Sequence, residues 1–409
     1  MTTKSFDLII YGASSFVGQI LTHYLVEHIG VNKNVRWAIA GRSSSKLQLL
    51  KESLGAVGAD LPMIIADAAD GDALASMCQS TRVVVTTVGP YALYGEPLVK
   101  ACAENGTDYC DLCGEAYWIK KMIVKYAESA KKSGARLVSC CGFDSIPSDL
   151  GVHFLQQKAK QRFGLFFNDI KLSVNAMKGG ASGGTLASMI EAVKAAMKDA
   201  TLRKEMNNPY ALCPENPDLK YAQISIKGPF FDQDIQRWVA PFIMEAINAR
   251  VVLRSNMLLD LPYGENFMYR EQMVSGAGLK GRLTALGLTL GLGLFAFSVV
   301  VSPIRKLMQR FVLPKPGEGP SPEAQLAGYF DVSLLGKNIQ GETLQVKVTG
   351  DRDPGYGCTA KMLAQAGLSL AFDFTEEEKV GGFWTPATAM GDKLIDRLTK
   401  HAGMTFEIE

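Results

Sequence analysis

Two glycines and a serine near the start of the chain have the types and spacing of a loop that binds a nucleotide diphosphate. Gly12, Ser15 and Gly18 follow the pattern G-x-x-G-x-x-G, with serine in place of the middle glycine, between an apolar run and a helix-like stretch. Gly12 would allow the tight turn, and Gly18 would let the helix approach the sheet. Ser15 restricts the approach of the diphosphate, but small hydroxyl side chains beside a helix N-terminus can still bind its oxygens. The residues expected to contact the cofactor are Gly12, Ala13, Ser14, Ser15, Phe16, Val17 and Gly18.

An arginine ends the second apolar run, where an NAD-binding protein would have an acidic residue. In "RWAIAGRSSSKL", Arg42 is followed by Ser43 and Lys46. A cation at this position suits the 2′-phosphate of NADP, whereas a carboxylate would suit the 2′-hydroxyl of NAD. The alternative for Arg42 is a solvated turn residue. We expect NADP(H) as the cofactor, with Asp67 after the third apolar run either beside the adenine or simply exposed.

The loop after the fourth apolar run is expected to border the cofactor. It contains "VGPY", in which Val88, Gly89 and Pro90 would lie at the carboxyl edge of the sheet. Tyr91 carries a hydroxyl that could protonate a substrate carbon. A simple turn between strand and helix is the alternative interpretation.

The loop after the sixth apolar run supplies the other catalytic candidates. In "CGFDSIPSDLG", Asp144 and Ser145 would face the nicotinamide if this turn opens towards the substrate. Ser148 or Asp149 would cap the helix that follows. The proton donor is therefore predicted to be Tyr91 or a water held by Asp144.

These loops need a parallel sheet to bring them to one edge. Up to about residue 150, short apolar runs alternate with longer amphipathic stretches, a pattern typical of a doubly wound α/β Rossmann domain. Residues 151–340 are predicted to form a second, α+β domain. Its expected strands include "DIKLSVNAMKGG" and "YAQISIKGPF". Residues 341–409 are the remaining, C-terminal segment.

Composition narrows the function classes. A chain of 409 residues favours two domains. Its net charge of +2 is too small to indicate a nucleic-acid partner. Eight scattered cysteines and four dispersed histidines give neither a disulfide framework nor a metal site. The start, "MTTKSFDLIIYG", lacks the features of a signal peptide, so we expect a cytoplasmic location.

One apolar segment departs from the soluble pattern. Residues 283–301 are uncharged over 19 residues, the length at which a membrane-spanning helix becomes a candidate. Gly287 and Gly291 have the spacing used for close helix contact in lipid. Two interpretations stay open: a helix buried in the second domain, or a helix that contacts a membrane by re-entry or in the interface. A full span is the least favoured, because it would separate the last hundred residues from the cofactor domain.

Four long motifs resemble one known family. The motifs are "GPYALYGEPLVKACAENGTDYCDLCGE", "CGFDSIPSDLG", "LPKPGEGPSPEA" and "GDRDPGYGCTAKMLA". Together they are similar to the saccharopine dehydrogenase-like oxidoreductases, and within that group to the trans-acting enoyl reductases. The resemblance runs from Phe6 to nearly the last residue. It implies a Rossmann domain, a second domain for substrate and dimer contacts at residues 151–340, a C-terminal segment at residues 341–409 that packs back on the core, and NADP(H) at Gly12–Gly18 and Arg42. Related eukaryotic proteins associate with lipid droplets or membranes, which fits a membrane or lipid-surface contact through residues 283–301. Many members have glycine where Ser15 stands.

Three functions are compatible with this sequence. The first is NADPH-dependent reduction of a C=C bond in a lipid or polyketide acyl chain carried as a thioester. The second is oxidation or reduction of an amino-acid imine, as in saccharopine dehydrogenases, and the apolar second domain makes it less favoured. The third is a non-catalytic NADP-binding protein at a lipid surface, which the lack of an obvious acid/base pair keeps open.

Overall fold

The computed structural model divides the chain into two compact units. The first comprises Met1–Ile146, Gly317–Gly319 and Gly355–Gly403, and the second comprises Pro147–Pro316, Pro320–Pro354 and Met404–Glu409. The structure describes residues 4–31, 34–180, 190, 193–194, 196–197, 199–214, 221–311, 319–375 and 377–409.

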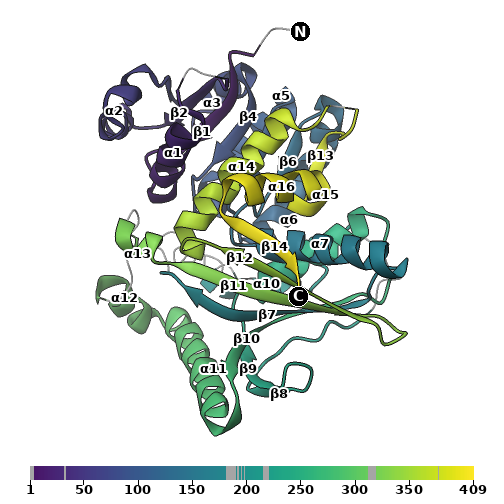
Figure 1. Ribbon diagram of the computed structural model, residues 1–409. Helices are drawn as coiled ribbons and strands as arrows, with labels where there is room; N and C mark the ends of the chain where they lie inside the picture. The colour runs from purple at the N-terminus through teal and green to yellow at the C-terminus, as the bar shows by residue number, and fades with distance from the viewer. Residues whose placement is uncertain are drawn as a thin grey trace. The chain divides into compact units, whose positions relative to one another are not determined.

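The first unit is built on a parallel seven-stranded sheet with the order β3-β2-β1-β4-β5-β6-β13 (Figure 1). The strands are β1 (Phe6–Tyr11), β2 (Trp37–Gly41), β3 (Met63–Ile65), β4 (Thr81–Thr86), β5 (Asp108–Asp111), β6 (Arg136–Val138) and β13 (Gly382–Trp384). The first six follow the doubly wound order 3-2-1-4-5-6, so the predicted Rossmann architecture is confirmed. The seventh strand comes from the C-terminal part of the chain and pairs in parallel with β6.

Helices connect the strands of the first unit. They are α1 (Phe16–Ile29), α2 (Ser44–Ser53), α3 (Gly71–Ser80), α4 (Tyr91–Tyr94), α5 (Glu96–Asn105), α6 (Ala116–Ser133), α14 (Thr359–Phe372), α15 (Pro386–Ala389) and α16 (Gly391–His401). Helix α14 is buried along almost its whole length and packs on β1, β4 and β5. Its small residues permit this, because a Cβ placed on Gly367 would lie 2.5 Å from Val85 Cγ2. The predicted return of the C-terminal segment is thereby confirmed.

The second unit contains a mixed seven-stranded sheet with the order β14-β12-β11-β7-β10-β9-β8. Its strands are β7 (Asp169–Lys178), β8 (Phe230–Asp232), β9 (Arg237–Pro241), β10 (Met268–Gly276), β11 (Tyr329–Lys337), β12 (Thr343–Gly350) and β14 (Met404–Ile408). Only the β7–β10 pair is parallel among these pairings. Its helices include α7 (Ile146–Phe163), α9 (Ala200–Met206), α10 (Glu245–Leu258), α11 (Gly278–Val300), α12 (Ser302–Phe311) and α13 (Pro322–Leu326).

One predicted strand of the second unit is wrong. The segment "YAQISIKGPF" was expected to be a strand from Tyr221, but only its last residue belongs to one, β8. The reason lies at the start of β10. There the side chain of Gln223, and not the backbone of its segment, forms the hydrogen bonds to the backbone of residues 267 and 269. Gln223 Nε2 donates to Phe267 O at 2.9 Å, and Gln223 Oε1 accepts from Tyr269 N at 3.0 Å.

Candidate active site

The turn between β1 and α1 has the geometry that the glycine pattern predicts. Gly12 adopts φ +84°, and a Cβ placed on it would lie 2.6 Å from Val88 Cγ2. A Cβ on Gly18 would lie 2.3 Å from Gly12 O, so α1 approaches the turn as closely as backbone atoms allow. Glycine is therefore required at both positions, the first for conformation and space and the second for space. Ala13 is fully buried beside them.

Ser15 holds this turn in shape. Its Oγ accepts from Gly18 N at 3.0 Å and so caps α1, and it forms a hydrogen bond with Thr87 Oγ1 at 2.8 Å. Thr87 Oγ1 in turn donates to Gly12 O at 2.9 Å. The predicted use of the Ser15 hydroxyl as a phosphate ligand is therefore less favoured than a structural use.

The first turn of α1 keeps donors that suit a diphosphate. The first N–H groups of a helix lack partners within the helix, and in α1 the Ser15 hydroxyl takes only that of Gly18. The N–H groups of Phe16 and Val17 remain at the positive end of the helix dipole. The Ser14 hydroxyl also has no hydrogen bond to the described part of the chain.

Phe16 packs against residues that are more than 300 positions away in the sequence. Its ring meets Tyr356 edge-on at a centroid distance of 4.9 Å, and a Cβ placed on Gly319 would lie 2.4 Å from Phe16 Cε1. Two later segments of the first unit therefore pack against the cofactor loop. Local sequence pattern carried no signal for this contact.

The end of β2 presents an unpaired cation. Arg42 is exposed and makes no hydrogen bond or ion pair with the described residues. Ser43 caps α2 by accepting from Lys46 N at 3.4 Å, which leaves the Lys46 side chain exposed. Burial raises the pKa of Tyr11 to about 12, with a further upward contribution from Asp67 and a downward one from Arg42. Arg42 and Asp67 thus lie close to the end of β1, as a site for the adenosine half requires.

Tyr91 is embedded in the loop after β4. Its hydroxyl donates to Thr86 O at 3.1 Å and accepts from Leu112 N at 3.1 Å. Burial raises the pKa of Tyr91 well above its ordinary value. A hydroxyl held by two backbone groups positions the Val88–Tyr91 loop, and these contacts favour Asp144 over Tyr91 as the proton donor. The Gly89–Pro90 peptide bond in this loop is cis.

Asp144, after β6, has a different environment. Its carboxyl is half-buried, makes no hydrogen bond to the described residues, and has a pKa raised to about 7 by burial. Its Oδ2 faces the β5 loop, because a Cβ placed on Gly114 would lie 3.8 Å away. The backbone around it is held by Phe143 N, which donates to Thr359 Oγ1 at 2.9 Å. The Asp144–Ser145 peptide bond is cis.

Ser145 is fully buried next to Asp144. Its Oγ has no hydrogen-bond partner in the part of the chain that the structure describes. Its backbone N donates to Cys140 O at 3.1 Å. The side chain is therefore less accessible to a substrate than that of Asp144.

Two buried carboxyls at the end of β5 were missed in the sequence. Glu115 Oε1 and Oε2 accept from Tyr91 N and Ala92 N, each at 3.0 Å, and so hold the start of α4. Asp111 accepts from Tyr109 OH at 2.7 Å and from Cys113 N at 2.9 Å. Burial raises the pKa of Asp111 to about 6. The available signal was "DLCGE", in which one acid ends the buried strand β5 and the other follows it within four residues.

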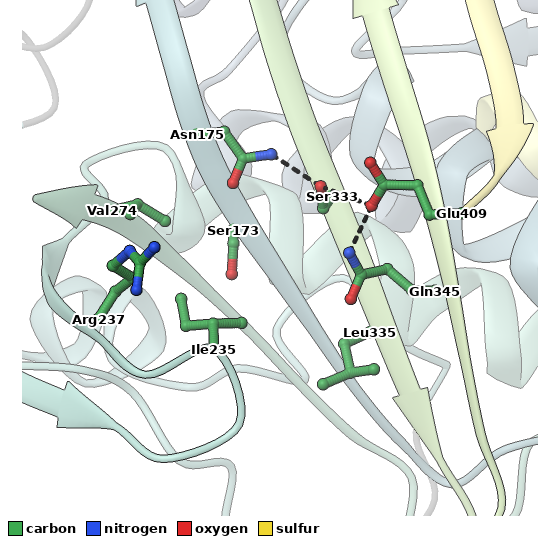
Figure 2. A pocket seen from close by; sticks show the side chains of 9 residues that line it. All are labelled: Ser173, Asn175, Ile235, Arg237, Val274, Ser333, Leu335, Gln345 and Glu409. Carbon is green, nitrogen blue, oxygen red and sulfur yellow. Dashed lines mark hydrogen bonds between the residues drawn. The ribbon is translucent and has the colours of Figure 1, made fainter. Parts of the chain in front are cut away.

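The described cavity of the second unit contains none of the predicted site residues. It has a volume of about 300 Å³ and lies on the polar face of the sheet (Figure 2). Asn175 Nδ2 donates to Ser333 Oγ at 2.7 Å, and Gln345 Nε2 donates to Glu409. These side chains satisfy one another, so the cavity gives no reason to move the candidate active site away from the first unit.

Comparison with known proteins places this geometry in a family. The family model of the saccharopine dehydrogenase NADP binding domain matches residues 8–138, from within β1 to the end of β6. A trans-acting enoyl reductase of Mycobacterium ulcerans is 35% identical over 416 residues, covering 97% of this chain and 96% of that protein. The chain belongs to the saccharopine dehydrogenase-like family, in its trans-acting enoyl reductase branch.

Further matches of this saccharopine dehydrogenase-like chain agree. A Mycobacterium tuberculosis protein, whose name marks it as a candidate trans-acting enoyl reductase, is 38% identical over 419 residues, or 99% of this chain and 98% of that one. The fold matches apo saccharopine dehydrogenase (L-Glu forming) from Saccharomyces cerevisiae, with a TM-score of 0.56, 13% identity and 99% of both chains covered. The chain is thus an NADP-binding oxidoreductase of this family.

Proposed function

We propose that this protein is an NADPH-dependent enoyl reductase that reduces a C=C bond in a lipid or polyketide acyl chain carried as a thioester. The observation that carries the proposal is Asp144, a half-buried carboxyl with a pKa of about 7 at the carboxyl edge of the Rossmann sheet. The names of full-length relatives support the same reaction class.

The residues at the edge of the first sheet fit NADP(H). The turn from Gly12 to Gly18 and the first N–H groups of α1 would hold the diphosphate. Arg42, with Ser43 and Lys46 at the start of α2, would bind the 2′-phosphate. When bound, NADPH supplies a hydride for the β-carbon of the enoyl thioester.

Reduction also needs one proton at the α-carbon, so that the C=C bond becomes CH–CH. Asp144 can supply it from its Oδ atoms or through a water held there, because a pKa near 7 leaves much of the carboxyl protonated at neutral pH. The carboxyl has no competing hydrogen bond from the described residues. Tyr91 and Glu115 hold the neighbouring loop in place through their hydrogen bonds.

Stopped-flow loss of NADPH absorbance tests the proposal with enoyl thioesters of increasing chain length. We expect turnover that slows as the pH rises through about 7, because the acid form of Asp144 is lost. Asp144→Asn should turn over about 10²- to 10⁴-fold more slowly, without that pH dependence.

Tyr91→Phe is the matched control for this experiment. It removes a hydroxyl from the same edge of the sheet but should keep the pH dependence. No NADPH oxidation with any chain length, together with turnover of saccharopine, would instead establish the amino-acid reaction.

A further inference from the structure

Helix α11 exposes an apolar surface that nothing in the described chain covers. It is 23 residues long, and its most apolar stretch has a mean hydropathy of 2.1 and is only 17% buried. Leu283, Leu290 and Leu294 are 59%, 58% and 68% exposed. A Cβ placed on Gly287, Gly291 or Gly293 would meet no other described atom within 4 Å. The interpretation of this segment as a buried helix is therefore wrong.

The helix is attached to the second sheet near its start. Gly281 packs against Gly276 at the end of β10, where an added Cβ would lie 2.3 Å from Gly276 O, and Ala285 is buried in the next turn. Figure 1 shows α11 beside β9, with α12 following it. From residue 286 to residue 297 no side chain is buried. An uncovered apolar patch on this scale marks a surface that binds a partner.

Charge identifies the kind of partner. Between Glu271 and Glu318 the sequence has no acidic residue, and its charged residues there are Lys280, Arg282, Arg305, Lys306, Arg310 and Lys315. Lys280, Arg282 and Lys306 are exposed in the structure. An apolar helix with cations at both ends complements an anionic lipid surface. A second copy of the same face would bring like charges together.

The topology of the second sheet indicates how α11 is oriented relative to a bilayer. The chain leaves from β10 and returns in β11, and both strands pair with β7. Both ends of the excursion are therefore anchored in one sheet, on one side of any bilayer. If α11 crossed the membrane, α12 with Arg305 and Lys306 would have to follow it and the chain would have to cross back, which lipid disfavours.

We propose that α11 and the first turn of α12 dock on an anionic lipid surface with the helix axis in the plane of the interface. Leu283, Leu290 and Leu294 enter the boundary between headgroups and acyl chains. Lys280, Arg282, Arg305 and Lys306 contact the headgroups. The docking is a property of the second unit and does not depend on the proposed reaction.

Vesicle co-sedimentation of the full chain tests this surface. Vesicles of phosphatidylcholine with 30% phosphatidylglycerol should bind the protein at least tenfold better than pure phosphatidylcholine, and salt should weaken binding. Leu290→Gln with Leu294→Gln should reduce binding at least tenfold. The matched control, Val124→Gln with Ile339→Gln, changes side chains that are 76% and 86% exposed elsewhere and should bind like the unmodified protein.

Charge neutralisation gives a second, graded measurement. Lys280→Gln with Lys306→Gln should lower binding to the anionic vesicles about fivefold per cation removed. Lys132→Gln with Lys178→Gln, two exposed lysines outside α11 and α12, should change it little. Equal loss in both pairs would show a diffuse charge effect and overturn the assignment to this helix.

Two further measurements complete the test: the depth of α11 in the bilayer and the self-association of the protein. Phe297→Trp should gain fluorescence quenching from lipids brominated near the headgroup, and stronger quenching from bromines near the bilayer centre would overturn the in-plane geometry. If Leu290→Gln with Leu294→Gln leaves vesicle binding unchanged and instead converts a dimer to a monomer in sedimentation velocity, the face binds a second copy and the lipid proposal fails.

Discussion

Arg42 and Asp144 lie at the same edge of the sheet but have different environments, which suit them to different functions. Arg42 is exposed without a described partner, so its charge is available to a phosphate at little desolvation cost. Asp144 is surrounded by protein atoms that disfavour its ionised form, so it keeps a proton near neutral pH. The first residue suits binding and the second suits proton transfer.

Arg42→Ala should weaken NADPH binding about tenfold to a hundredfold, because a charge-assisted hydrogen bond contributes about 1.5–3 kcal/mol. Binding of NADH should change little, since NADH lacks the 2′-phosphate. Calorimetric titration with both nucleotides measures this. Lys51→Ala, at the other end of α2, is the control. Equal weakening of both nucleotides would contradict a role in phosphate recognition.

Asp144→Asn should make the protein more stable than the unmodified chain above pH 7. The folded pKa of about 7 exceeds the ordinary value of 3.8, so the folded state binds more protons between these pH values. Stability from this group therefore falls as the pH rises from about 4 to 7, and asparagine removes that loss. Melting temperatures at pH 5 and pH 8 check it: the advantage of the variant should grow with pH. A constant difference would mean that Asp144 does not titrate in this range.

At the scale of elements, two contacts fix α1 to the cofactor turn. One is the N-terminal cap of the helix, and the other is the close approach of its first turn to the backbone that follows β1. Ser15 supplies the cap, and Gly18 supplies the space beside Gly12 O. The same elements therefore provide helix stability and a diphosphate site. The serine that departs from the common glycine pattern is used for structure.

Gly18→Ala should destabilise the protein by about 1–3 kcal/mol and weaken NADPH binding, because the added methyl overpacks the turn. Gly71→Ala is the control, since a Cβ there meets no described atom within 4 Å. Denaturant unfolding and nucleotide titration measure both effects. Ser15→Ala, which adds no bulk, should lose about 1 kcal/mol of stability through the missing cap. If Gly18→Ala, Ser15→Ala and the control Gly71→Ala all had the same stability, this explanation of the turn would be refuted.

At the scale of the whole molecule, the C-terminal part of the chain completes both sheets. Strand β13 extends the Rossmann sheet beyond β6, and β14 extends the second sheet beyond β12. Each unit therefore needs residues that are distant in sequence. Folding of either one requires contacts that close long loops.

Deletion of Met404–Glu409 should destabilise the second unit and leave nucleotide binding in the first unit intact. The deletion exposes the β12 edge and removes the packing of Phe406 against Phe154. Each kcal/mol lost should lower the melting temperature by about 2–4 °C. Calorimetry with NADPH titration separates the two units, and Glu407→Ala, exposed in the same strand, is the control. Loss of NADPH binding would show that β14 also supports the first unit.

The sequence by itself determined the elements whose signals are local. Alternating strands and helices, the glycines of the cofactor turn and the cation after β2 depend on neighbours a few residues apart, and the structure has them where the pattern predicts. The failed strand from Tyr221 shows the limit, because a side chain from that segment replaced its backbone in pairing with β10.

Tertiary structure alone decided the strand order, the insertion of β13, the contact of Phe16 with Tyr356 and the burial that raises the pKa of Asp144. It also decided that α11 is exposed, although its composition fits a buried helix equally well. Each of these depends on which distant residues meet. Hydrophobic periodicity predicts that one face of an element is buried, but it does not predict which other element packs against that face.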